Sequence, residues 1–79
     1  MNAYELYNHV FDSANDYSGE SVAYIKEYAE NVFGIIVPDE TATLILECKA
    51  AIDCVNANNG NWQNNYYYHV RAPLEDIEL

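Results

Sequence analysis

The sequence predicts a small, mainly α-helical domain of three helices, built around a central helix, with a C-terminal segment that is extended or irregular. Apolar residues recur at helical spacing in three separate stretches, and residues typical of helix caps border these stretches. The chain is also rich enough in apolar residues to form a core, with 51% hydrophobic residues. A length of 79 residues suits one modest core, so we expect residues 1–79 to form a single domain.

The first helix is expected to begin at the N-terminus. Asn2 can cap it, and Glu5, three residues later, can complete a capping box. The residues that follow the spacing of one apolar helix face are Ala3, Leu6, Tyr7, Val10, Phe11 and Ala14. The opposite side carries Glu5, Asp12 and Asp16, with His9 at its margin. The sequence therefore predicts a helix with one apolar and one anionic side.

A second amphipathic helix is expected to follow a break at residues 15–19. Ser18 is the predicted N-cap, with Tyr17 packing on Val22, and Gly34 is the predicted C-terminal stop. The predicted core stripe consists of Val22, Ile25, Ala29, Val32 and Phe33. The residues predicted to face away from it are Glu20, Tyr24, Glu27, Glu30 and Asn31. This helix, too, is expected to present acidic side chains to solvent.

Residues 38–57 are expected to form the central helix, with Pro38 in its first turn. Its broad apolar stripe comprises Leu44, Ile45, Cys48, Ala51, Ile52 and Val55. A narrower stripe on the other side comprises Leu46, Ala50 and Ala57, with Cys54 at its edge. We expect the N-terminal half to cover the broad stripe, and either the last twenty residues or a second copy of the chain, in a homodimer, to cover the narrow one. Residues 35–37 are expected to plug into the core.

The C-terminal part is ambiguous. Asn58-Asn59-Gly60 is expected to end the central helix. Aromatic and polar residues alternate over residues 61–71, which favours a strand in a short two-stranded pairing with residues 34–37, and a fourth, irregular helix is the alternative. Pro73 is expected to end this element, leaving residues 74–79 as one last turn or as an acidic tail.

The residues that carry chemistry are sparse. Cys48 and Cys54 lie six apart, on different faces of a helix, so we expect two small buried hydrophobes and no disulfide. No glycine-rich phosphate loop and no zinc spacing occur, and we expect no cofactor and no enzymatic activity. Glu5, His9 and Asp12 have the spacing of a metal site on one helix side, but three solvated residues are the interpretation we favour over a metal-dependent enzyme.

The charge balance restricts the partners. Thirteen Asp and Glu against three Lys and Arg give a formal net charge of −10. Such a chain repels nucleic acid and anionic membranes and attracts basic proteins, unless the acidity serves only solubility. No signal peptide and no apolar run of about 18 residues are present, so a cytoplasmic location is expected.

Six acids are expected to point outward because the other sides of their helices face the core: Glu5, Asp12, Asp16, Glu20, Glu27 and Glu30. Carboxylates seven residues apart on a helix are separated by roughly 10 Å, a spacing comparable to that of successive phosphates along a groove. Tyrosine occurs eight times, and tyrosines are common interface anchors. The predicted anchors are Tyr24 and one or more of Tyr66, Tyr67 and Tyr68.

One stretch resembles a known family: Tyr7-Asn8-His9-Val10-Phe11-Asp12-Ser13-Ala14. It looks like the opening helix of a phage DNA-mimic antirestriction family, and in size and charge the chain is similar to small phage-encoded anti-CRISPR proteins. The resemblance implies an inhibitor that occupies the nucleic-acid site of a basic host defence protein, in the host cytoplasm. An immunity protein or antitoxin that neutralises a cognate basic nuclease is the alternative.

Overall fold

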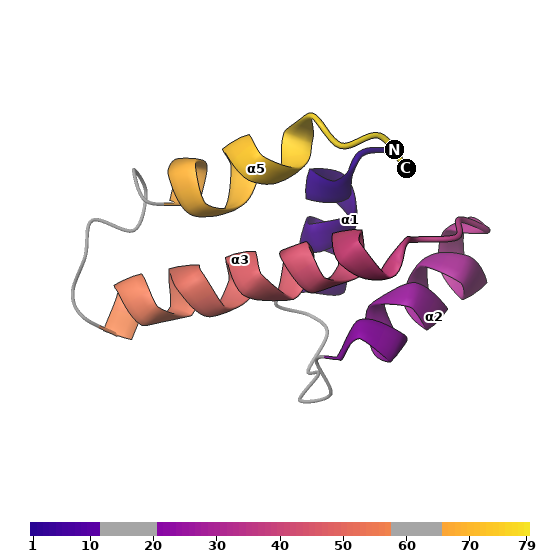
Figure 1. Cartoon of the computed structure of the whole chain (residues 1–79), viewed down its shortest axis with the longest axis horizontal. Helices are drawn as coiled ribbons and strands as arrows, with labels where there is room; N and C mark the ends of the chain where they lie inside the picture. The colour runs from indigo at the N-terminus through magenta and orange to yellow at the C-terminus, as the bar shows by residue number, and fades with distance from the viewer. Residues whose placement is uncertain (12–20, 58–65) are drawn as a thin grey trace.

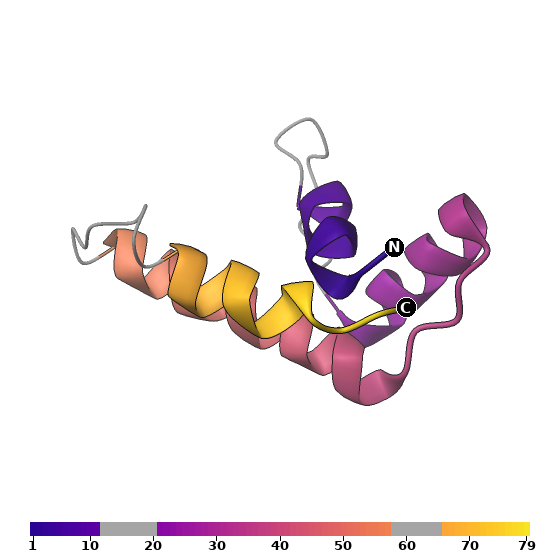
Figure 2. The ribbon, with the colours of Figure 1, turned by 90° about the horizontal axis from the view of Figure 1, so that it is seen from above.

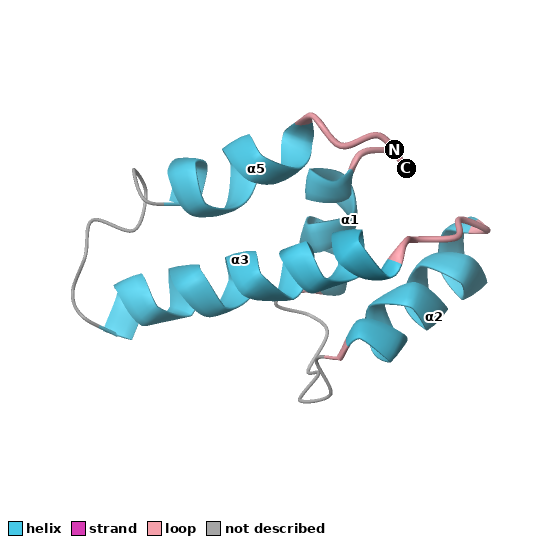
Figure 3. Cartoon of the chain, viewed as in Figure 1, coloured by secondary structure: helices cyan, strands magenta, loops and turns pink. Residues whose placement is uncertain are grey.

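The mainly helical class is confirmed in the computed structural model, which describes residues 1–11, 21–57 and 66–79 (Figures 1 and 3). The elements in chain order are α1 (Ala3–Val10), α2 (Val22–Phe33), α3 (Asp39–Ala57), the π-helical turn η1 (Tyr67–Arg71) and α5 (Ala72–Glu75). η1 and α5 are continuous, and we call them together the C-terminal helical segment. The predictions for Asp12, Ala14, Asp16, Tyr17, Ser18, Glu20 and Asn58-Asn59-Gly60 lie outside the described residues.

The longest helix, α3, is the central element, as predicted. The C-terminal helical segment runs alongside it in the opposite direction, and α2 lies near its N-terminal end (Figures 1 and 2). α1 packs against α2, α3 and α5. The two chain ends meet beside α1, where the amide of Ala3 donates to the carbonyl of Ile77 (2.8 Å) and the amide of Leu79 to that of Met1 (3.0 Å). A short antiparallel bridge, Asn2 to Glu78, therefore closes the fold.

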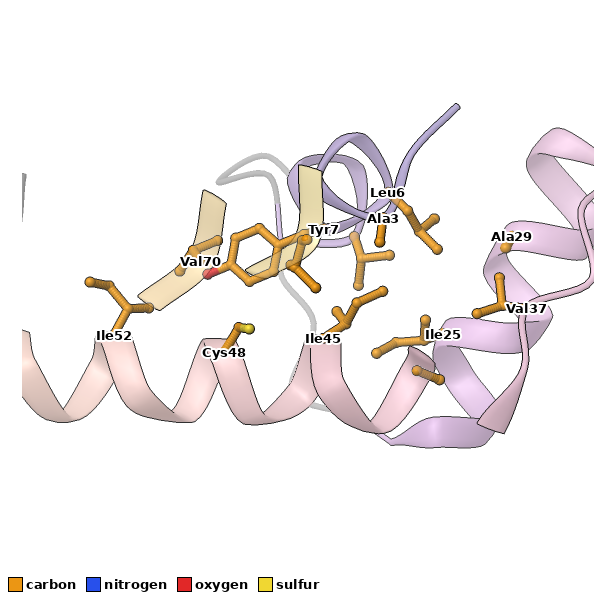
Figure 4. Close-up of a cluster of buried hydrophobic side chains, with 13 residues drawn as sticks. Ala3, Leu6, Tyr7, Ile25, Ala29, Val37, Ile45, Cys48, Ile52 and Val70 are labelled. Carbon is orange, nitrogen blue, oxygen red and sulfur yellow. The ribbon is translucent and has the colours of Figure 1, made fainter. Parts of the chain in front are cut away.

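The broad face of α3 forms the floor of the core. Ile45, Cys48 and Ile52 are buried and point toward Tyr7 of α1 and Val70 of η1 (Figure 4). Three further members of the predicted broad stripe are half-buried: Leu44, Ala51 and Val55. The N-terminal half and the C-terminal helical segment thus cover the same face of α3.

The prediction that the tail covers the narrow stripe of α3 is therefore wrong for the described residues. Ala50 and Ala57 are exposed, and Leu46 is half-buried. The tail packs on the broad face because Val70 and Leu74, four residues apart, present one fully buried apolar edge to it. A homodimer through Leu46, Ala50 and Ala57 stays a prediction.

The preferred strand over residues 61–71 is also wrong where the chain is described, since Tyr67–Arg71 is helical. The Ala72 amide donates to the Tyr67 carbonyl, five residues back, which makes this turn π-helical. Pro73 does not end the element. It lies in the first turn of α5, just after the widened turn, where its missing N–H is tolerated.

The segment expected to pair with that strand instead caps α2. The amide of Gly34 donates to the Glu30 carbonyl (3.0 Å), four residues back, as in the αL motif of helix ends, and the amide of Ile35 donates to the Ala29 carbonyl (3.2 Å). Gly34 has φ 68°, as the predicted left-handed stop requires. Of the expected core plug, residues 35–37, only Val37 is fully buried, and Ile36 is 82% exposed.

Side-chain caps mark the first residues of α1 and α2. The predicted capping box of α1 is confirmed: the Asn2 side chain accepts from the Glu5 amide (2.8 Å), and Glu5 accepts from the Asn2 amide (3.1 Å). α2 begins at Val22 and is capped by Ser21, whose hydroxyl accepts from the Tyr24 amide (3.1 Å). The N-cap of α2 in the described residues is therefore Ser21.

Substitution of Leu74 tests how much the C-terminal helical segment contributes to the stability of the fold. Its side chain is 0% exposed, so Leu74→Ala should lower the free energy of unfolding by about 2–5 kcal/mol through lost burial and the cavity left behind. Pro73→Ala, at the exposed neighbouring position, should change it by less than about 1 kcal/mol. Urea denaturation measures both values. Equal small effects would show that this segment does not contribute to the core.

The cysteines differ, which corrects the prediction that both are buried: Cys48 is buried and Cys54 is exposed. Burial raises the pKa of the Cys48 thiol, and the charge of Glu47 raises it further. Iodoacetamide at pH 8 should therefore modify Cys54 at least about tenfold faster than Cys48. Mass spectrometry of the Cys48→Ser and Cys54→Ser variants assigns each rate. Equal rates would contradict the burial of Cys48.

The raised pKa of Cys48 also makes stability depend on pH. The unfolded chain releases this proton at lower pH than the folded chain, so the stabilising contribution is complete below the ordinary thiol pKa. It is lost as the pH rises through the raised, folded-state value. Cys48→Ala should remove this part of the alkaline loss of stability in urea titrations between about pH 7 and pH 10. An unchanged pH profile in that variant would contradict the shift.

Candidate interaction surface

The surface charge of the protein is almost uncompensated. All three basic side chains are engaged locally: Lys26 pairs with Asp39, Lys49 with Asp53 at 2.9 Å, and Arg71 with Glu75 at 3.0 Å. No Lys or Arg in the sequence therefore remains to neutralise the other carboxylates. The exposed acids on α2 and α3 without a basic side-chain partner are Glu27, Glu30, Glu40 and Glu47. Their field persists at the surface because no internal cation offsets it.

The six acids predicted to face outward fall into three groups. Glu27 and Glu30 are exposed on α2, as expected. Glu5 is exposed at the start of α1, where its carboxylate also accepts the Asn2 amide of the capping box. The three others, Asp12, Asp16 and Glu20, lie outside the described residues. The predicted acidic surface is thus represented in the structure mainly by α2.

A cleft of about 330 Å³ opens on the outer side of α2, and we call it the α2 cleft. The described residues that line it are Tyr24, Glu27, Tyr28, Asn31 and Val32. The rings of Tyr24 and Tyr28 lie 6.1 Å apart, centroid to centroid, at an interplanar angle of 43°. Both tyrosines are half-buried, and the hydroxyl oxygen of Tyr24 is buried. Two of the residues singled out from the sequence, Tyr24 and Glu27, therefore meet in one concave site.

Contacts with the rest of the fold position the tyrosines of the α2 cleft. Tyr28 packs edge-to-face on Phe33 with ring centroids 6.1 Å apart. Phe33 in turn meets the His9 ring of α1 at 5.0 Å. On the other side of α2, Ile25 and Ala29 are fully buried against the core. The cleft is thus built on a helix whose opposite face is already packed.

The α2 cleft combines aromatic faces with a carboxylate, and this combination binds cations. A guanidinium or ammonium group attracts the face of a tyrosine ring, and Arg also stacks on aromatic rings. Glu27 supplies the opposite charge, and the Asn31 side chain supplies a hydrogen-bond acceptor. The side chain that fits this chemistry best is an Arg or Lys of a partner protein.

The three C-terminal tyrosines have different roles. Tyr66 is half-buried: its hydroxyl donates to Asn8 Oδ1 (3.0 Å), and its ring lies edge-on to those of Tyr4 and Tyr7. Burial raises the pKa of Tyr66, and a hydrogen bond with Tyr4 adds to this shift. Tyr66 thus serves the fold. Tyr67 and Tyr68 are exposed, Tyr68 by 71%, and only these two are available as anchors.

The predicted anchors do not form one continuous surface. Tyr67 and Tyr68 lie at the start of the C-terminal helical segment, toward the end of the long axis opposite α2 (Figures 1 and 2). The α2 cleft holds Tyr24 at the other end. A partner that contacts the cleft therefore reaches Tyr67 and Tyr68 only through a separate contact.

Sequence reasoning missed two residues of the cleft, Tyr28 and Val32. Val32 was expected in the core, but it is 55% exposed because the buried arc of α2 centres on Ala29. The signal was the spacing of Tyr24, Tyr28 and Val32. Residues at i, i+4 and i+8 form one edge along a helix.

The alternative metal site is not assembled in the part of the chain that the structure describes. Among these residues, no group of three or more His, Cys, Asp and Glu side chains is placed to hold a metal ion. Of the candidate set, Glu5 caps α1, His9 packs on Phe33, and Asp12 lies outside the described residues. In the same part of the chain, no helix has the length and apolar character needed to cross a membrane.

Comparison with known proteins identified no protein similar to this chain. Neither the protein-family models, nor the curated proteins, nor the solved structures compared with this chain include a match. The resemblance of residues 7–14 to the phage antirestriction family therefore stays a prediction. The mainly helical fold rests on the structure itself.

Proposed function

We propose that this protein is a non-enzymatic inhibitor of a nucleic-acid-binding host defence protein. In this proposal the α2 cleft, together with the exposed acids Glu27 and Glu30 of α2, binds the basic residues with which the partner holds phosphates. Glu27 and Glu30 stand in for phosphate charges, and Tyr24 and Tyr28 provide the aromatic contact. The bound inhibitor then blocks the nucleic-acid site of the partner.

One observation carries the proposal: the uncompensated carboxylate of Glu27 lines a tyrosine-walled cleft, and Glu30 is exposed on the same helix three residues later. Every Lys and Arg of the chain is paired elsewhere, so Glu27 and Glu30 remain available to an external cation. Nucleic-acid-binding proteins concentrate Lys and Arg where phosphates bind. The same side chains can therefore pair with Glu27 and Glu30, and tyrosine adds contact area at small entropic cost.

Tyr67 and Tyr68 provide a second contact in this proposal. Their rings meet edge-to-face with centroids 5.4 Å apart, so they form one exposed aromatic pair. The pair carries no carboxylate of its own, and Arg71 nearby is held by Glu75 and by the Tyr4 ring. Its role is apolar anchoring at the end of the molecule opposite the α2 cleft.

The proposal predicts which acids matter. The full chain, immobilised, should capture a basic nucleic-acid-binding protein from a nuclease-treated bacterial lysate. Glu27→Gln/Glu30→Gln should weaken the captured complex at least about tenfold, because two charge pairs are lost at the interface. The matched control Asp76→Asn/Glu78→Gln removes two exposed charges that pair with no Lys or Arg and lie outside the α2 cleft, and it should change affinity by less than about threefold. Surface plasmon resonance on the purified partner measures both.

Competition decides how the partner is inhibited. Added duplex or single-stranded nucleic acid should displace the partner from the immobilised protein, and raised salt should weaken binding. If the partner binds the immobilised protein and the nucleic acid at the same time, the protein does not occupy the nucleic-acid site. That result would contradict the proposed phosphate mimicry and favour the immunity-protein alternative. Equal losses in the two double variants, or capture of no nucleic-acid-binding protein, would overturn the proposal.

A further inference from the structure

A second concave surface lies between the first half of α3 and the end of the chain, and we call it the α3–tail groove. Its volume is about 620 Å³, within the range of ligand and peptide sites. The described residues that line it are Glu40, Thr41, Thr43, Leu44, Glu47 and Ile77. None of them lines the α2 cleft, so this groove is a distinct feature of the surface.

The floor of the α3–tail groove is apolar and preformed. Leu44 and Ile77 are half-buried and pack against the core, which leaves part of each side chain open to the groove. The backbone holds Ile77 on both sides: its carbonyl accepts from the Ala3 amide (2.8 Å), and its amide donates to the Leu74 carbonyl (3.2 Å). An apolar side chain inserted here would bury surface without first ordering the floor.

The α3 wall of the groove carries two acids. Glu40 and Glu47 are exposed and seven residues apart, two helical turns or roughly 10 Å along one side of α3. Leu44 lies between them, four residues after Glu40 and three before Glu47. No cation of this chain neutralises the pair, since Lys26 and Lys49 are held by Asp39 and Asp53. The groove therefore alternates negative, apolar and negative along the axis of α3.

We infer that the α3–tail groove docks a basic amphipathic helix of a partner protein. A helix lying alongside α3 rises by the same distance per residue, so its side chains can repeat in register with the wall. Lys or Arg at positions i and i+7 would face Glu40 and Glu47, and an apolar residue at i+3 or i+4 would enter between Leu44 and Ile77. The alkyl stems of the basic residues would cover the remaining apolar floor.

In this inference the α3–tail groove selects a helix by the spacing of its basic and apolar side chains. The inference does not depend on the proposed role of the α2 cleft. Charge alone would attract any cationic segment to a protein of charge −10. The apolar floor between the two acids adds a requirement for helical spacing. Helix-in-groove recognition uses the same i, i+3, i+4 and i+7 anchors.

The test uses a synthetic helical peptide of about 15 residues, long enough for partial helicity, with Lys at i and i+7 and Leu at i+3 and i+4 in an alanine background. The comparison peptide has the same composition, with both Lys moved to the opposite helix face. Fluorescence anisotropy with the full chain at low salt gives both affinities. The in-register peptide should bind about fivefold more tightly than its isomer.

Two double variants, each removing two charges, locate the binding. Glu40→Gln/Glu47→Gln should abolish the preference of about fivefold for the in-register peptide over its isomer, and Glu27→Gln/Glu30→Gln should change this preference by less than about twofold. Circular dichroism shows whether both variants keep the helical fold. Equal losses of this preference in the two variants, equal binding of the two peptides, or no binding at millimolar peptide would overturn the inference. None of these results depends on whether the α2 cleft binds a nucleic-acid-binding protein.

Discussion

The packing of one face of α3 is the constraint on which the rest of the structure depends. Ile45, Cys48 and Ile52 form this face, and side chains of α1, α2 and the C-terminal helical segment bury it from different directions (Figure 4). The fully buried partners from those three elements are Ala3, Leu6, Val10, Ile25, Ala29, Val70 and Leu74. Since each element commits one side to α3, its opposite side is fixed toward solvent. The acidic surfaces follow from that orientation.

Features set by local contacts could be predicted from the sequence. The capping box of α1 joins residues three apart, and the end of α2 at Gly34 needs only a glycine in the left-handed conformation. Short segments of sequence therefore determine both features. The buried stripe of α3 follows from periodicity alone. The C-terminal helical segment could not be predicted in this way, because alternation over residues 61–71 resembles a strand. The burial of Val70 and Leu74 against distant elements makes it helical.

The candidate site was predictable in its charge and only in part in its shape. An excess of acids and the exposure of Glu27 follow from composition and helix phase, and Tyr24 was correctly placed beside Glu27. The depth of burial around α2 is a tertiary property, so Val32 was misassigned to the core. The α3–tail groove joins Leu44 to Ile77, thirty-three residues later, and no sequence pattern indicates that contact.

Recognition by charge requires acids that are both uncompensated and held in place. Pairing of every Lys and Arg within the chain meets the first condition. The second condition depends on the docking of α2 on the core through Ile25 and Ala29.

Native-state amide hydrogen exchange tests the docking of α2 most directly. Amides in the middle of α2 should open with nearly the same free energy as those of α3 around Cys48. Fast exchange in α2 beside a protected α3 would contradict this docking.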